Sequence, residues 1–85
     1  MNELPSHLEE ALLRLVREKL FDGGAPMTVE TDLFAAGLDS MGIMQLMISI
    51  EERFGVRVPE ASVTRENFST ASSLAALVRR GAAPA

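Results

Sequence analysis

The segment from Ser40 to Phe54 constrains the fold of this chain most strongly, because its apolar residues recur with the period of an α-helix. Asp39 precedes the segment, where an N-cap residue belongs, and Gly55 follows it, where a left-handed turn can end a helix. We therefore predict a helix over residues 40–54. On a helical wheel its apolar residues share one face, which must be buried: Ile43, Leu46, Met47, Ile50 and Phe54.

The opposite face of this predicted helix is less polar than a solvated face should be. It consists of Met41, Gln45, Ile48 and Glu52, with Met44 at its edge. Its three apolar residues have two interpretations. They belong to the core of a bundle that packs on further sides, or they form an exposed surface that binds partners.

Two more helices are predicted, one on each side of this segment. The first covers roughly residues 6–21, where Ser6 and Glu9 have the spacing of a capping box and the run Phe21-Asp22-Gly23-Gly24 ends the pattern. Its apolar positions are Leu8, Leu12, Leu15, Val16 and Leu20. The last helix follows a cap at Thr70 and carries the stripe Leu74, Leu77 and Val78, and Gly81 and Pro84 close the chain.

The connections between the helices lack a sustained period. Residues 22–39 form a long loop that we expect to be pinned by Leu33, Phe34 and Leu38. Residues 56–59 are extended and end at Pro59, and residues 63–68 are predicted to form one short helical turn. No strand alternation is present, so the fold class is all-α. We predict a small four-helix bundle, with three main helices and one short helix.

Length and composition limit the possible functions. The 85 residues form one domain, 1–85, with flexible termini expected at about 1–4 and 81–85. The chain has no cysteine, one histidine and a net charge of −4, which exclude thiolate metal sites and argue against nucleic-acid binding. The N-terminus does not resemble a signal peptide, and no apolar run is long enough to span a bilayer. We expect a monomeric cytoplasmic protein.

Catalytic and metal-binding constellations are missing from the sequence. His7 is expected to be exposed near the start of the first helix, and the adjacent Glu51 and Glu52 point in different directions on a helix, so they cannot form an acid–base pair. We expect no metal site and no enzymatic activity of the chain alone. Glu51 and Glu52 are expected on a solvated face, where Arg53 and Arg57 are available to pair with them.

Ser40 is the residue most suited to chemistry. It falls at the first position of the predicted helix, where a phosphate on its hydroxyl would meet the positive end of the helix dipole. No base adjoins it except Asp39, so a second protein would have to activate the hydroxyl. The alternative is an ordinary serine beside an Asp cap.

The run Asp32-Leu33-Phe34-Ala35-Ala36-Gly37-Leu38-Asp39-Ser40-Met41 resembles the phosphopantetheine attachment motif of acyl and peptidyl carrier proteins, with Met41 replacing the usual leucine. The resemblance implies that Ser40 is the attachment point within the motif Gly37, Leu38, Asp39 and Met41. It implies that a phosphopantetheinyl transferase adds 4'-phosphopantetheine from coenzyme A, with Asp39 helping to present Ser40 and bind magnesium. The thiol of the arm would then hold an acyl group as a thioester.

Within that family, three pieces are most similar to D-alanyl carrier proteins and stand-alone aminoacyl carriers: Asp39 to Gly42, Arg53 to Pro59, and Asn67 to Ala71. The similarity implies an aminoacyl cargo, an adenylating ligase that loads it, and a downstream acyltransferase or other acceptor enzyme. The pathway would be biosynthetic, such as nonribosomal peptide or polyketide assembly. The alternatives are fatty-acyl or polyketide cargo, or an unmodified helical interaction domain. A well-filled core would leave little internal room for a long acyl chain.

The predicted surface for partner docking follows from a departure from the family pattern. Fatty-acid carriers line their second helix with acids, whereas here acids return only at Glu51 and Glu52. We therefore expect partners to dock mainly by apolar burial, with Glu52 at the rim. The predicted docking face consists of Met41, Met44, Gln45, Ile48 and Glu52.

Overall fold

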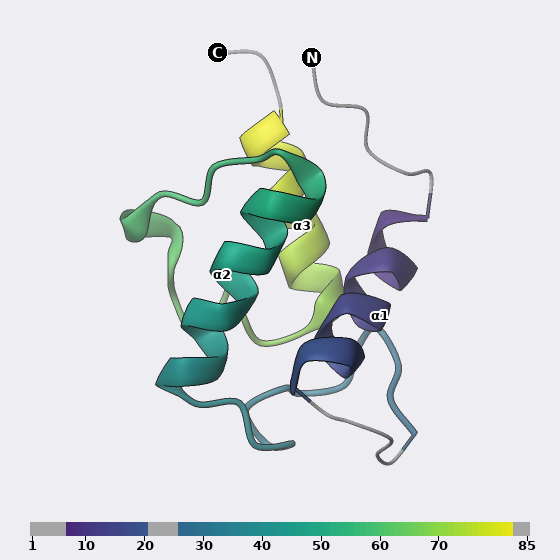
Figure 1. Ribbon diagram of the computed structural model, residues 1–85. Coiled ribbons are helices and arrows are strands. Elements are labelled where there is room, and N and C mark those ends of the chain that lie inside the picture. The colour runs from purple at the N-terminus through teal and green to yellow at the C-terminus, as the bar shows by residue number, and fades with distance from the viewer. Residues whose placement is uncertain (1–6, 21–25, 83–85) are drawn as a thin grey trace.

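The computed structural model describes residues 7–20 and 26–82, and within these ranges the chain is all-helical. Its elements are α1 (Leu8–Leu20), α2 (Ser40–Phe54), the 3₁₀ helix η1 (Glu60–Ser62) and α3 (Ala71–Ala82) (Figure 1). The prediction of an all-α fold is confirmed. The described ranges hold three α-helices and one 3₁₀ turn, so the fourth α-helix of the predicted bundle is not found there.

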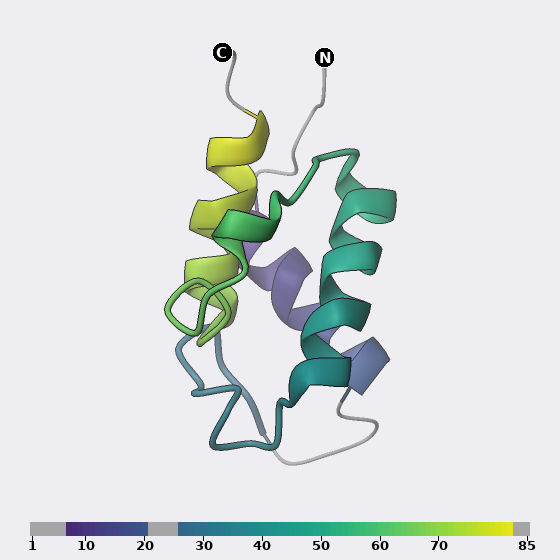
Figure 2. The same ribbon diagram turned by 90° about the vertical axis from the view of Figure 1, so that its left-hand side faces the viewer.

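The helices are arranged around one apolar core. α1 packs against both α3 and α2. α2 and α3 run in the same direction, and residues 55–70 return along the molecule between them (Figures 1 and 2). The largest side chains that are fully buried come from all three helices and from two loops: Leu8, Leu12, Leu15, Val16, Leu33, Leu46, Ile50, Phe68, Leu74 and Val78.

The described part of the connection between α1 and α2, residues 26–39, is held by its apolar side chains. Leu33 and Leu38 are buried, and Phe34 is partly buried against the core, as predicted. The Leu33 N–H donates to the carbonyl oxygen of Ser69 at 2.8 Å, and the Ser72 N–H donates to that of Val29 at 2.9 Å. These bonds tie the connection to the start of α3.

The predicted helical turn over residues 63–68 is present only as a single hydrogen-bonded turn, and the 3₁₀ helix lies earlier in the chain. Helical structure occurs three residues earlier, in η1, where the Ser62 N–H donates to the carbonyl oxygen of Pro59 at 2.9 Å. Proline, with its φ of −65°, is suited to begin such a turn. Residues 65–68 form this single turn, in which the Phe68 N–H donates to the Thr64 carbonyl at 3.1 Å and Thr64 Oγ1 accepts the Asn67 N–H at 3.1 Å. Asn67 Nδ2 donates to the Ser62 carbonyl at 2.8 Å.

The ends of the helices agree with the sequence where they are described. Thr70 caps α3, since its Oγ1 accepts the Ser73 N–H at 2.9 Å. α3 includes Gly81 and continues to Ala82. A Cβ at Gly81 would collide with Val56, so the glycine permits a close contact. The predicted capping box at Ser6, the glycine pair, Pro84 and most of the expected flexible termini lie outside the described residues.

None of the helices in residues 7–20 and 26–82 combines the length and the hydropathy needed to cross a bilayer.

Candidate attachment site at the start of α2

A turn over residues 33–37 leads the chain into α2. Asp32 Oδ1 accepts the backbone N–H groups of Phe34 at 3.0 Å and Ala35 at 3.2 Å, which closes the turn at its start. Gly37 has a φ of 120°, a conformation that L side chains rarely adopt, so glycine is required at this position. Leu38 then enters the core and fixes where the helix begins.

Asp39 and Ser40 form the N-terminus of α2 as predicted. The backbone of Asp39 is extended, with φ −127° and ψ −174°, and its Oδ1 accepts the Gly42 N–H at 2.9 Å. Ser40 is the first helical residue and is exposed. Within the described chain no residue forms a hydrogen bond with the Ser40 hydroxyl, while the Asp39 carboxylate is engaged as the cap. The hydroxyl is therefore free for modification by an external enzyme.

Gly42 has a structural role that the sequence reasoning missed. It is buried, and a Cβ at this position would lie 2.8 Å from Leu38 Cδ1 and 3.5 Å from Leu20 Cδ2. The glycine therefore lets the first turn of α2 lie directly on the loop and on the end of α1. A glycine inside an otherwise strong helical pattern was the signal for such a close approach.

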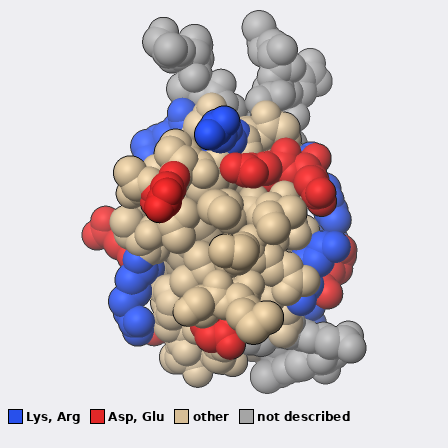
Figure 3. Space-filling model, turned by 60° about the vertical axis from the view of Figure 1, so that its left-hand side comes forward, with Lys and Arg blue, Asp and Glu red and all other residues tan. Residues whose placement is uncertain are grey.

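The outer face of α2 is exposed, so the interpretation of its apolar residues as core is wrong. Met41, Met44 and Ile48 are 81%, 59% and 48% exposed, and Gln45 and Glu52 are exposed beside them. Figure 3 shows this side of the molecule as a broad area of uncharged side chains, with charged ones mainly near its edges. His7 is also exposed, as expected.

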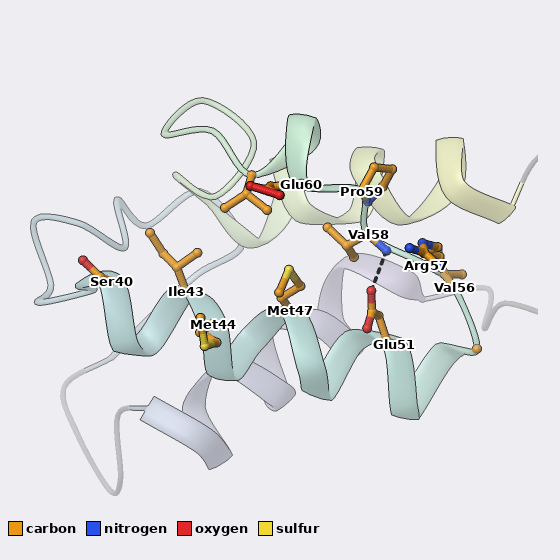
Figure 4. A pocket seen from close by; sticks show the side chains of 12 residues that line it. Ser40, Ile43, Met44, Met47, Glu51, Val56, Arg57, Val58, Pro59 and Glu60 are labelled. Atoms are coloured by element: carbon orange, nitrogen blue, oxygen red, sulfur yellow. Dashed lines mark hydrogen bonds between the residues drawn. The ribbon is translucent and has the colours of Figure 1, made fainter.

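The inner face of α2 borders a groove as well as the core. Leu46 and Ile50 are fully buried, whereas Ile43, Met47 and Phe54 are only partly buried. The groove has a volume of about 970 Å³ and lies between α2 and the segment of residues 55–63. Along α2 it begins at Ser40 and continues past other side chains of the helix, namely Ile43, Met44, Met47 and Glu51 (Figure 4).

Glu51 is not the solvated acid that the sequence predicted. Its side chain is partly buried and reaches across the groove, where Oε2 accepts the Val58 N–H at 2.9 Å (Figure 4). The predicted pairing of Arg53 with the neighbouring acids is also wrong, because Arg53 Nη2 lies 3.6 Å from Glu18 Oε1 on α1. The groove and the role of Glu51 were missed because both depend on where residues 55–63 return.

Taken together, a free serine hydroxyl at a helix N-terminus, a groove that begins there and a charge-poor face beside it define a helical carrier domain. The family model for the phosphopantetheine attachment site matches residues 10–78. The chain therefore belongs to the phosphopantetheine-binding carrier protein family. Its members hold 4'-phosphopantetheine covalently and are not catalysts themselves, which confirms the predicted cofactor and the expectation of a non-enzyme.

Curated relatives and a solved structure agree with this assignment. The chain is 35% identical over 68 residues to a D-alanyl carrier protein of Streptococcus suis strain 05ZYH33, covering 79% of this chain and 85% of that protein. It is 40% identical over 58 residues to the D-alanyl carrier protein of Streptococcus sanguinis strain SK36, covering 67% and 73%.

One structural neighbour comes from a crystal structure of Bradyrhizobium japonicum glycine:[carrier protein] ligase complexed with its cognate carrier protein and an analogue of glycyl adenylate. The TM-score is 0.65 at 25% identity, and the match covers 85% of this chain and 91% of that one. In both comparisons, the chain is therefore similar to proteins that carry, or are complexed with a ligase for, an amino acid.

Proposed function

We propose that this chain carries an aminoacyl group as a thioester on a 4'-phosphopantetheine arm attached to Ser40, and presents it to partner enzymes of a biosynthetic pathway. The observation that supports the attachment point best is the exposed Ser40 hydroxyl at the first residue of α2, without a hydrogen-bond partner in the described chain. A phosphodiester on this oxygen would lie at the positive end of the helix dipole.

Other hydroxyl groups are less suitable for the arm. Ser69 Oγ donates to the Glu66 carbonyl at 2.9 Å, and Ser72 Oγ donates to Glu9 Oε2 at 3.0 Å. Ser49 is buried within α2, with 8% of its surface exposed. A transferase would have to break these bonds or open the helix, whereas Ser40 needs no rearrangement.

The proposed cargo rests on the relatives, which are D-alanyl carrier proteins, and on the neighbour bound to a glycine:[carrier protein] ligase. An adenylating ligase would use ATP to activate the amino acid and transfer it to the thiol of the arm. Fatty-acyl or polyketide cargo is the second candidate, and the open groove at Ser40 favours it, because an apolar chain would gain burial there.

The proposed partners are a phosphopantetheinyl transferase, the ligase and a downstream acyltransferase or other acceptor enzyme. Their docking face would be Met41, Met44, Gln45, Ile48 and Glu52, which are all exposed along α2, from beside Ser40 to the last turn of the helix. Flexible methionines suit a surface that several enzymes contact in turn. Since coenzyme A and ATP are cytoplasmic metabolites, we propose that the protein acts in the cytoplasm. We also propose that it is a monomer.

The test of this function is stepwise intact mass spectrometry. The purified protein is incubated with coenzyme A and a broad-specificity transferase, and then with ATP and the adenylating ligase from its own genome. We expect one mass increase for the arm and a second for an aminoacyl group. A second increase that matches a fatty-acyl group would contradict the proposed cargo, and a mass that never rises would contradict the carrier function.

A further inference from the structure

The groove beside α2 has a length that matches a phosphopantetheine arm attached to Ser40. Glu51 lies eleven residues further along the same helix, which corresponds to about 16 Å of helix rise. From the serine oxygen to its sulfur, the arm has roughly fourteen bonds, as many as the backbone of four to five residues, and so spans about 16 Å when extended. An arm laid along the groove would therefore bring its thiol to the level of Glu51.

The groove offers apolar contacts to such an arm along its length. Ile43 and Met47 line it on α2, Val58 and Pro59 lie opposite at the level of Glu51 (Figure 4), and Val63 also lines it. The arm has a dimethyl-substituted carbon near its phosphate and methylene groups beyond it. Burial of these groups against the two walls would hold the arm in the groove without a specific hydrogen bond.

The far part of the groove contains one carboxylate. Figure 4 shows Glu51 there with Arg57 beyond it, whereas Glu60 lies nearer to Ser40, opposite Ile43 and Met47. Oε2 of Glu51 accepts the Val58 N–H at 2.9 Å, and within the described chain no Lys or Arg nitrogen lies within 4.0 Å of this carboxylate. A partly buried carboxylate that lacks a cation favours a positively charged ligand, since an ion pair offsets part of its desolvation.

We propose that the groove holds the loaded arm along α2, and that Glu51 binds the ammonium group of the aminoacyl cargo. This inference rests on the proposed function, with Ser40 as the attachment point. An aminoacyl thioester has its ammonium on the carbon next to the carbonyl, so the charge lies close to the sulfur. Glu51 is then a specificity-determining residue: it distinguishes an aminoacyl group from an acyl group of similar size that carries no charge.

The experiment compares three cargoes on the arm: alanyl, N-acetylalanyl and butyryl groups, each joined by an amide in place of the thioester to prevent hydrolysis. The transferase installs each arm from the corresponding coenzyme A analogue, and intact mass confirms attachment before any other measurement. The readout is the NMR chemical shift of the Val58 backbone N–H, which reports on Glu51 directly. An arm that fails to attach would count against the proposed function, and only attached arms test the present inference.

The variants are Glu51→Gln and its matched control Glu52→Gln. The amide oxygen of glutamine can still accept the Val58 N–H, so E51Q removes the charge and keeps the bond. Glu52 is the next residue of α2, is exposed and does not line the groove. In the unmodified protein and in E52Q, one partly screened ion pair should raise the bound-to-free ratio of the alanyl arm about two- to fivefold over that of the N-acetylalanyl arm, so the alanyl arm should shift the Val58 N–H more.

In E51Q this difference should disappear, while the apolar contacts of the arm persist. Raising the salt concentration should reduce the difference in the unmodified protein as well, which tests the inference without any variant. Equal shifts for the alanyl and N-acetylalanyl arms would overturn the proposal. A difference that survives in E51Q, or that is lost equally in E52Q, would also overturn it.

Discussion

We propose that Asp39 has two tasks, which a substitution can separate. Its carboxylate caps α2 through the Gly42 N–H at 2.9 Å, and the family resemblance implies a further task at magnesium in the transferase complex. Capping requires only a side-chain oxygen of the right length, whereas magnesium binding favours a charged oxygen. The two tasks therefore depend on different properties of one side chain.

We predict that Asp39→Ala lowers the free energy of unfolding by about 1 kcal/mol, because the Gly42 N–H loses its partner. Asp39→Asn should keep nearly all of the stability, since asparagine caps as well as aspartate does. It should nevertheless be modified at Ser40 more slowly. Urea unfolding measures the first effect, and the initial rate of arm attachment measures the second. If Asp39→Asn is modified at the normal rate, Asp39 only caps the helix and has no role at magnesium.

At the scale of single elements, α2 separates stability from recognition by its two faces. Leu46 is fully buried on the inner face, and Ile48 is 48% exposed on the outer face two residues later. Both are large aliphatic side chains on the same helix. Truncating each to alanine therefore compares a core position with a surface position in nearly the same backbone environment.

Leu46→Ala should cost about 2–5 kcal/mol of unfolding free energy, the usual range for a buried leucine. Ile48→Ala should lower the unfolding free energy by much less than Leu46→Ala does. It should nevertheless reduce loading by the ligase several-fold, because the exposed apolar face loses contact area. Thermal unfolding and loading rate are measured on both variants. If Ile48→Ala unfolds the protein, the face is structural.

A salt series with Glu52→Ala provides the charge control for this face. We expect Glu52 to influence the encounter rate, so the effect of its removal should fade as salt rises, while that of Ile48→Ala should remain. If Glu52→Ala reduces loading more than Ile48→Ala at every salt concentration, docking depends on charge.

Much of α2 and its site was predictable from the sequence, because its determinants are local. Asp39, Gly55 and the apolar period define the two ends and the faces of the helix without reference to the rest of the chain. The 3₁₀ helix at Glu60–Ser62 was missed because residues 59–68 have no such period. There, Pro59 and the side chain of Asn67 decide between alternatives that differ by a few hydrogen bonds.

At the scale of the whole molecule, the groove depends on contacts between distant segments. Its outer wall, residues 55–60, is held on one side by the Glu51–Val58 hydrogen bond of 2.9 Å and on the other by close packing of Val56 against Gly81 of α3. No periodic pattern in the sequence indicates that Glu51 or Gly81 contacts this wall. This is why the core was predictable and the groove was not.

Gly81→Ala tests the packing of that wall by the sign of its effect. Glycine to alanine within a helix normally stabilises by roughly 0.5–1 kcal/mol. Here the new Cβ would collide with the side chain of Val56, which is buried and branched at Cβ and so adjusts poorly. We predict a loss of about 1–3 kcal/mol in urea unfolding. A more stable variant would mean that the wall is free to move.

The central claim is that Ser40 carries the arm, and its most direct test is the intact mass of three proteins coexpressed with a broad-specificity transferase. The unmodified sequence and Ser69→Ala should each gain the mass of one phosphopantetheine. Ser40→Ala should fold normally, as circular dichroism and thermal unfolding would show, and should gain nothing. An arm that still attaches to Ser40→Ala, or that is lost in Ser69→Ala while Ser40 is intact, would contradict the account.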